Sequence, residues 1–213
     1  MGNYGGVVAT TPVAPRSWAA AKTPDPVRGA AAAAALLKRA KWTYSAGGWM
    51  LPSKKPARLE ILTLPAQAFP ADAAVAAQAA AAWGTFGIPT TVSELDADAL
   101  AARLAAGEFT LAVVSIDIGL EPDLYTLFGS GAILTGGNIT GIQLRALDSM
   151  LNAARRPGTL VERQAAAAVV QRWLASALYV LPVRFSADEV LVGERVRGVD
   201  PMVVGEPESH LRA

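Results

Sequence analysis

Cysteine is absent from this chain of 213 residues, and the single histidine is His210. Without cysteine there are no disulfides, no thiolate metal sites and no cysteine nucleophiles. His210 lies in a polar stretch close to the end of the chain, so it cannot form a rigid catalytic pair with serine or cysteine. A histidine-based hydrolase is therefore excluded, and we expect no enzymatic activity.

Long apolar runs and an excess of charge of one sign are also missing. The longest run of small apolar residues, 29–37, is far shorter than the roughly 20 residues of a membrane-spanning helix. Lys and Arg total 19, Asp and Glu total 18, and no basic segment is interleaved with aromatic residues. We expect no nucleic-acid partner. Arg155 and Arg156 precede Pro157 and Gly158, where a helix is expected to end. Cationic side chains interact favourably with the C-terminal end of a helix dipole, and this accounts for the two arginines.

Metal and nucleotide sites find little support in the sequence. Asp117, Glu121 and Asp123 form the one local acidic group with spacing suited to a cation, but such a group in a loop is more often a solvated turn. The glycine-rich stretch 129–137 lacks the Lys-Ser/Thr of a phosphate-binding loop. A hydrolase that uses Asp117 and Glu121 as paired carboxylates is a third, weak alternative. We expect neither a metal nor a cofactor.

The residues that are present predict a folded α/β protein. Hydrophobic residues make up 52% of the chain and charged residues 17%, which is unlike a disordered sequence. Alternating segments of strand and helix periodicity indicate an α/β fold, for which we expect a mixed sheet with flanking helices. We expect an extended arm over 1–23, a lobe over 24–200 and a flexible tail over 201–213.

Within the lobe, four strands are expected in one sheet, over 58–64, 90–95, 109–116 and 179–185, and a further strand over 190–196. Helices are expected over 26–41, 72–86, 142–154 and 160–177. Asp25 and Pro26 carry the N-cap and first-turn signature of the first helix. Asp96 is expected to cap a short helix that Gly107 ends.

A loop-like stretch over 117–141 follows the apolar strand, and loops of this length are usually functional or disordered. Asp117 stands where open α/β sheets present groups to ligands, although it could instead cap the turn at Gly119. Asn138 is either a cleft-facing donor or a side chain that stabilises its own turn. Trp49, in a glycine-rich loop, is either a lobe-contact residue or an exposed aromatic in a cleft.

The order of motifs resembles the second, ligand-clamping lobe of the family 5 extracellular solute-binding proteins, the peptide and nickel receptors of ABC importers. The resemblance covers roughly residues 12–200 and rests on motifs in the right order. They are Asp25-Pro26, Leu36-Leu37, Trp42, Gly87-Ile88, Gly107-Glu108-Phe109, Asn138, Gly141, Asp148, Leu151, Ala154, Glu162-Arg163, Trp173-Leu174, Leu181-Pro182 and Val196-Arg197-Gly198-Val199.

This resemblance implies a lobe like that of type II periplasmic binding proteins, which captures a peptide-like or other small solute. The implied partners are the solute, an N-terminal lobe missing from this chain and an ABC permease. The implied location is extracellular or periplasmic, with a lipoprotein anchor in the missing N-terminal region. The alternative is a regulatory interaction protein with the same fold, as in a mycobacterial lipoprotein linked to cell-wall lipoglycan synthesis. A lobe face left exposed is expected to promote self-association.

The resemblance also implies where a ligand is held. Family members often follow the apolar strand with Trp-x-x-Asp and then an acid before proline, and the first acid pairs with the amino group of a peptide. Here Ser115 and Ile118 replace the Trp and the Asp, Asp117 lies one residue early, and Glu121-Pro122 fits the pattern. The expected ligand-binding residues are Asp117, Glu121, Asn138 and Trp49.

Overall fold

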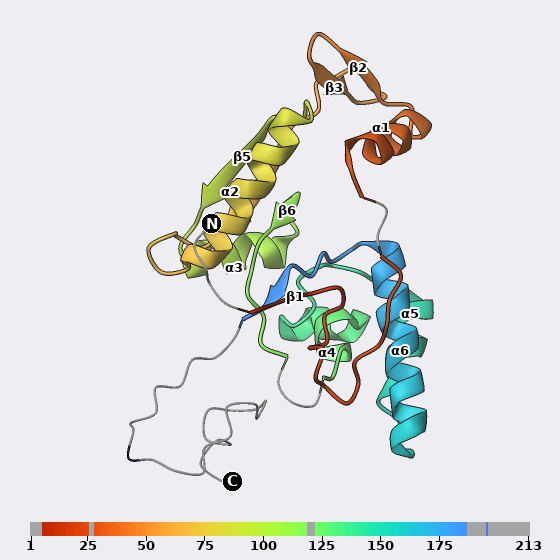
Figure 1. Cartoon of the computed structure of the whole chain (residues 1–213). Helices are drawn as coiled ribbons and strands as arrows, with labels where there is room; N and C mark the ends of the chain where they lie inside the picture. The colour runs from red at the N-terminus through yellow and green to blue at the C-terminus, as the bar shows by residue number, and fades with distance from the viewer. Residues whose placement is uncertain (1–5, 26–27, 119–121, 187–194, 196–213) are drawn as a thin grey trace. The chain divides into compact units, whose positions relative to one another are not determined.

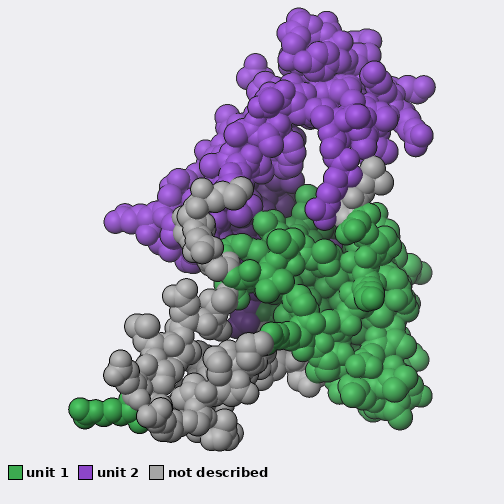
Figure 2. Space-filling view, viewed as in Figure 1, with its two compact units in different colours: residues 1–25, 118–129, 144–213 green, residues 26–117, 130–143 purple. Residues whose placement is uncertain are grey.

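A computed structural model describes residues 6–25, 28–118, 122–186 and 195. The chain divides into two compact units, which Figure 2 shows in separate colours. Each unit combines segments that are distant in the sequence: unit 1 comprises residues 1–25, 118–129 and 144–213, and unit 2 comprises residues 26–117 and 130–143. Among the described residues, no helix is both long and apolar enough to cross a membrane.

The centre of unit 2 is a three-stranded parallel sheet with the strand order β5-β4-β6. Strand β4 (Leu59–Thr63) pairs along its length with β5 (Thr90–Glu94) and more briefly with β6 (Leu111–Ala112). Helix α2 (Pro70–Thr85) connects β4 to β5, and α3 (Ala97–Ala106) connects β5 to β6 (Figure 1). Parallel crossovers are right-handed, and these two cross the sheet in opposite directions, so the helices cover opposite faces.

Local sequence signals set the bounds of these helices. Pro70 occupies the first turn of α2, where its missing N–H costs nothing. The Asp96 side chain accepts a hydrogen bond from the Ala99 N–H at the start of α3. Gly107 ends the same helix in the left-handed conformation, with φ 68°. The predicted roles of Asp96 and Gly107 are therefore confirmed.

Strand β4 is the buried centre of this sheet. Ile61 and Leu62 point to opposite faces of the strand and are both fully buried. On the helices, Ala76 of α2 and Leu100 of α3 are buried as well. A strand that is apolar on both faces is what a sheet covered by helices on both sides requires.

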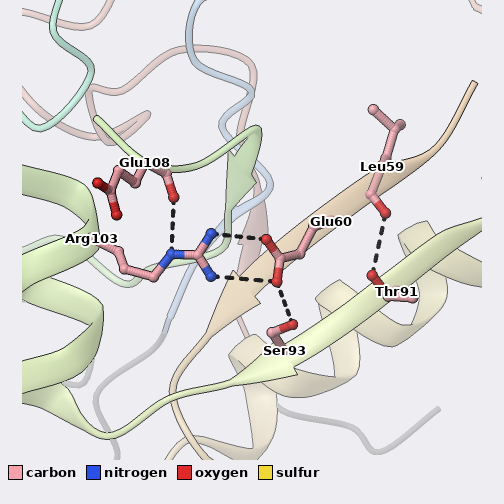
Figure 3. Close-up of polar contacts among 6 residues, drawn as sticks. All are labelled: Leu59, Glu60, Thr91, Ser93, Arg103 and Glu108. Atoms are coloured by element: carbon pink, nitrogen blue, oxygen red, sulfur yellow. Dashed lines mark hydrogen bonds and ion pairs between the residues drawn. The ribbon is translucent and has the colours of Figure 1, made fainter. Parts of the chain in front are cut away.

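One polar network crosses the sheet between β4, β5 and α3 (Figure 3). Arg103 Nη2 donates to Glu60 Oε2 at 2.9 Å, and the Ser93 hydroxyl donates to Glu60 Oε1 at 2.6 Å. Arg103 Nε also donates to the Glu108 carbonyl at 2.9 Å. The bonds hold α3 against the strands at a half-buried position.

A small second core lies beside the sheet in unit 2. Helix α1 (Ala30–Arg39) is followed by a hairpin of β2 (Thr43–Ser45) and β3 (Gly48–Met50). The buried residues of this core are Trp49, Ala57 and Ile88, with Ala34, Leu37, Trp42, Leu59, Trp83 and Phe86 packed against them. This hairpin was not predicted, because its strands are three residues long and its glycines indicate a loop.

The start of α1 also differs from the expectation. The helix begins at Ala30, with Gly29 as its N-cap and no side-chain capping bond, so the prediction of a start at Asp25-Pro26 is wrong. Pro26 itself lies outside the described residues. Gly29 has φ 101°, a conformation that glycine adopts without strain and that ends the extended segment before the helix.

Unit 1 is built on two packed helices, α5 (Arg145–Ala154) and α6 (Leu160–Ala177), with the short α4 (Tyr125–Phe128) beside α5. Its two-stranded antiparallel sheet pairs β1 (Val7–Val8) with β7 (Arg184–Phe185). The buried side chains on the two long helices are Leu147, Leu151, Ala167, Val170, Gln171 and Leu174.

The predicted N-terminal arm is bound to α6. Gln171 Nε2 donates to the Ala19 carbonyl at 2.7 Å, and the Ala21 N–H donates to Gln171 Oε1 at 3.2 Å. Gln171 is fully buried, so both ends of its amide are satisfied by backbone from a segment about 150 residues earlier.

Two of the predicted strands are corrected. Of the strand expected over 109–116, only Leu111–Ala112 forms, because β6 is an edge strand and the chain leaves the sheet after it. Of the strand expected over 179–185, only Arg184–Phe185 forms, and it pairs with β1 instead of the parallel sheet. The strand expected over 190–196, apart from residue 195, and the tail over 201–213 lie outside the described residues.

Candidate ligand-binding site

The parallel sheet of unit 2 has a topological switch point. The chain passes from β4 to β5 on one side and from β5 back to β6 on the other, so β4 lies between two strands reached in opposite directions. The carboxyl ends of β4 and β6 are neighbours. Open α/β sheets bind ligands in the crevice that forms at such a point.

Three polar residues lie at the carboxyl edge of this sheet. Thr63 is the last residue of β4, Asp72 lies in the first turn of α2, and Ser115 follows β6. The Ser115 hydroxyl donates a hydrogen bond of 2.8 Å to Asp72 Oδ1. This bond joins the start of α2 to the segment after β6.

Two of these side chains are not fully satisfied within the described residues. Asp72 is 8% exposed and Thr63 is fully buried, yet Asp72 Oδ2 and Thr63 Oγ1 have no hydrogen-bond partner among the described residues. A buried polar atom without a partner costs about 1–3 kcal/mol, and more when the group is charged. A hydrogen-bond donor supplied by a ligand would therefore stabilise Asp72 Oδ2.

Asp117 adds an exposed carboxyl group to the same segment. It follows Ser115 by two residues and lies beyond the carboxyl end of β6, although not directly after the strand as expected. Asp72 and Ser115 were not predicted as site residues. The available signal was an aspartate two residues after Pro70 at a helix start, a pattern that also occurs in any well-formed first turn.

Asn138 is used by its own turn. The residue is 3% exposed and follows the 3-10 helix Ser130–Thr135. Its Nδ2 donates to the Ile142 carbonyl at 3.0 Å, and its Oδ1 accepts from the Thr140 hydroxyl at 2.6 Å. The expected cleft-facing donor is therefore corrected to the alternative, a side chain that stabilises its turn.

Trp49 belongs to the second core of unit 2. It is 3% exposed, its ring lies 5.5 Å from that of Phe86, and its Nε1 donates to the Phe86 carbonyl at 3.0 Å. The alternative of an exposed aromatic in a cleft is therefore wrong. The short hairpin of β2 and β3 directs this side chain into the core. The sequence around Gly47 and Gly48 has no strand periodicity, so it does not predict the hairpin.

The remaining acids named from the sequence are Glu121 and Asp123. Glu121 lies outside the described residues. Asp123 is in unit 1, where its Oδ2 lies 3.3 Å from Arg155 Nε. Within the part of the chain that the structure describes, no three acidic or histidine side chains gather where they could hold a metal ion.

Comparison with known families decides the relationship. The family model "Bacterial extracellular solute-binding proteins, family 5 Middle" matches residues 1–132, more than half of the chain. The chain belongs to this family. Family 5 proteins are binding proteins and not enzymes. The resemblance seen in the order of sequence motifs is thus confirmed.

Solved structures show the fold of this family 5 chain. The oligopeptide-binding protein AppA from Bacillus subtilis, in complex with a nonapeptide, is similar at TM-score 0.74 and 17% identity over 85% of this chain and 37% of AppA. A dipeptide-binding protein from Pseudoalteromonas in complex with Met-Leu has a TM-score of 0.71 at 17% identity, over 85% of this chain and 35% of its own.

NikZ from Campylobacter jejuni, in complex with Ni(L-His), has a TM-score of 0.70 at 17% identity, over 85% of this chain and 37% of its own. This family 5 chain therefore has the predicted α/β lobe of a periplasmic binding protein, and it spans about a third of the length of the structures it matches. No curated protein sequence matches the chain significantly.

Proposed function

We propose that the carboxyl edge of the parallel sheet in unit 2 is part of the binding surface for a small solute that carries a hydrogen-bond donor, such as a protonated amino group. The observation that carries the proposal is the buried Asp72, which has one oxygen bonded to Ser115 and the other without a partner among the described residues. Asp117 supplies a second, exposed carboxyl group on the same segment.

The chemistry of this edge supports a cationic or amine-bearing solute. A carboxylate accepts hydrogen bonds only, so a ligand that satisfies it must donate. Charge-assisted hydrogen bonds of this kind are roughly twice as strong as neutral ones. The ligands named for similar structures are a nonapeptide, Met-Leu and a nickel–histidine complex, which makes a peptide-like solute a reasonable first probe.

The wider role proposed here is delivery of that solute to an ABC importer outside the cytoplasmic membrane. In this role the chain contributes one wall of a cleft, and a permease and a further lobe are its partners. A regulatory interaction protein with the same fold is the alternative. It is favoured if no solute of this class is bound, because such a protein would have no need of an amine acceptor at this edge.

A nuclear magnetic resonance titration tests the proposal. The dipeptide Met-Leu is titrated into the labelled chain, and N-acetylated Met-Leu, which lacks the amino cation, is titrated in parallel. We expect shifts in the amide signals of residues 113–118 with the free dipeptide and much smaller shifts with the acetylated one. Asp72→Asn and Asp117→Asn should each weaken binding, by about tenfold or 1.4 kcal/mol for a lost charge-assisted bond.

Glu108→Gln is the matched control. Glu108 is an exposed acid in the same unit, but it precedes β6 and so lies at the amino end of the strand. Its replacement should leave the affinity unchanged. Equal shifts with both dipeptides would show that the amino group is not recognised. Equal losses in Glu108→Gln and Asp117→Asn would show that net charge and not this edge attracts the ligand.

A further inference from the structure

Unit 1 contains a pocket of about 410 Å³ that the proposed function does not use. It lies at the ends of two helices, where α5 stops after Ala154 and α6 begins after Thr159. Its apolar floor is formed by Leu124, Leu151 and Ala167, all of them buried. Exposed residues of the connection between the helices, among them Arg156, form its rim, so it opens to solvent.

The charged lining of this pocket is predominantly cationic. Arg155, Arg156 and Arg163 line it, and Asp123 is the single acid among the lining residues that the structure describes. The formal charge of these described lining residues is therefore +2, whereas the whole chain carries only +1. Arg156 has no ion-pair partner among the described residues. A cleft lined by one sign of charge concentrates ligands of the opposite sign.

Two of the arginines are held in place by aromatic rings. The Arg155 guanidinium lies 4.6 Å from the centre of the Tyr125 ring and is paired with Asp123 at 3.3 Å. The Arg163 guanidinium lies 4.3 Å from the centre of the Trp18 ring. Stacking of this kind fixes the plane of a guanidinium, and a fixed plane loses less entropy when it binds a carboxylate through two parallel bonds.

The polar atoms that these side chains offer are almost all donors. Guanidinium groups and the indole N–H have no acceptor atoms. Trp18 Nε1 is also buried without a hydrogen-bond partner among the described residues. Donors above an apolar floor fit a ligand with acceptor atoms and negative charge at one end and an apolar body at the other.

We infer that this pocket binds a small organic anion, a carboxylate with a flat or chain-like apolar body. The carboxylate lies against Arg156 and Arg163 at the rim, and the apolar body covers Leu151 and Ala167. This site is separate from the carboxyl edge of the sheet in unit 2, so either proposal can fail without the other.

The favourable interaction of cations with the end of a helix explains part of this arrangement, since Arg155 and Arg156 directly follow α5. It does not explain Arg163, which lies near the start of α6, where a cation is unfavourable. The stacking of Arg163 on Trp18 places that cation at the pocket in spite of the helix dipole.

Fluorine magnetic resonance with 4-fluorobenzoate tests this site on the whole chain. The neutral, nearly isosteric 4-fluorobenzamide is the matched ligand. We expect saturable line broadening of the benzoate signal and little change in the benzamide signal. Arg156→Met and Arg163→Met should each reduce the affinity for benzoate by about tenfold or more, as the loss of one charge-assisted contact does.

Arg172→Met is the control variant, because Arg172 is an exposed arginine on the same helix α6 and does not line the pocket. It should bind benzoate like the parent chain. Arg163→Lys keeps the charge but not the fork of donors, so it should fall between the parent chain and Arg163→Met. Circular dichroism of every variant verifies that the helices are intact.

Three results would overturn the inference. The first is the absence of saturable benzoate binding, and the second is equal binding of benzamide, which would mean that only the apolar floor is used. The third is an equal loss in Arg172→Met and Arg156→Met, which would assign the binding to the general positive charge of the chain. Benzoate binding that Met-Leu leaves unchanged would confirm that the two sites are distinct.

Discussion

At the scale of single residues, the Glu60 carboxylate of unit 2 accepts hydrogen bonds from the side chains of Arg103 and Ser93. Its pKa is lowered from the ordinary value of 4.5, first by the hydrogen bond from Arg103 and then by that from Ser93. Both Glu60 and Arg103 have side chains that are 34% exposed, so solvent screens the pair and its contribution to stability is modest. The network joins β4, β5 and α3, so its loss should destabilise the packing of all three elements.

This shift predicts how stability depends on pH. Because the pKa of Glu60 is lower in the folded chain than in the unfolded chain, ionised Glu60 stabilises the fold at pH above 4.5. That contribution is lost as the pH falls from 4.5 through the lowered pKa. In Glu60→Gln we therefore expect a smaller fall in the urea unfolding midpoint between neutral and acid pH than in the parent chain.

A series of urea titrations across that range measures the effect, and Arg103→Gln should show the same reduced slope. Glu108→Gln is the comparison, since the Glu108 backbone carbonyl and not its carboxylate accepts the bond from Arg103. If Glu60→Gln and the parent chain lose stability in parallel as the pH falls, the pair contributes nothing measurable.

Residue-scale prediction from the sequence succeeded where the deciding interaction is local. Asp96 and Gly107 were assigned to the ends of α3 because a cap depends on neighbours within four residues. Asp72 was missed because its significance comes from Ser115, which is 43 residues away and reaches it only after the sheet has formed. Glu121 stays a prediction.

At the scale of elements, long segments were predicted well and short ones poorly. Helices α2 and α6 have sixteen and eighteen residues and are rich in alanine, which has the highest helix propensity. Strand β6 has two residues, and its apolar surroundings suggested a longer strand than the sheet edge accommodates. The hairpin of β2 and β3 depends on packing of Trp49 under Phe86, which no local pattern indicates.

The cap of α3 provides a test at this scale. Asp96→Ala removes the acceptor of the Ala99 N–H and should lower the free energy of unfolding by about 1 kcal/mol, the usual cost of a lost N-cap. Asp96→Ser retains an acceptor at the same place, so it should restore most of the loss. Urea unfolding measures the free energy, and hydrogen exchange at Ala99 reports the cap directly.

Equal losses in Asp96→Ala and Asp96→Ser would contradict this explanation. In that case the charge of Asp96 at the helix start, and not its capping hydrogen bond, would be the stabilising feature.

At the scale of the whole molecule, the division into two units was beyond sequence reasoning. The segment around Val7 pairs with Phe185, and Ala19 is held by Gln171, so unit 1 closes over separations of more than 150 residues. Patterns read along the chain contain no information about which distant strands pair. The strand near 184 was for that reason assigned to the same sheet as the other three strands, although the element itself was expected.

The pairing of β1 with β7 leaves an exposed apolar ribbon in unit 1. Val8 is 72% exposed and Leu181 is 57% exposed, and Val7 and Val183 are exposed as well. Both strands of a two-stranded sheet are edge strands, with one row of backbone donors and acceptors unpaired within the sheet. Apolar edges of this kind pair with other chains unless a charge or a covering element prevents it.

We therefore expect the chain to self-associate through this ribbon, and Val8→Lys to weaken the association by about tenfold, or 1.4 kcal/mol. Sedimentation velocity across a dilution series measures the dissociation constant. Leu134→Lys is the matched control: it also replaces an exposed apolar residue and adds one positive charge, but Leu134 lies in the 3-10 helix of unit 2. An equal effect of the two substitutions would mean that net charge governs association, and a parent chain that is monomeric throughout the series would show that the ribbon drives none.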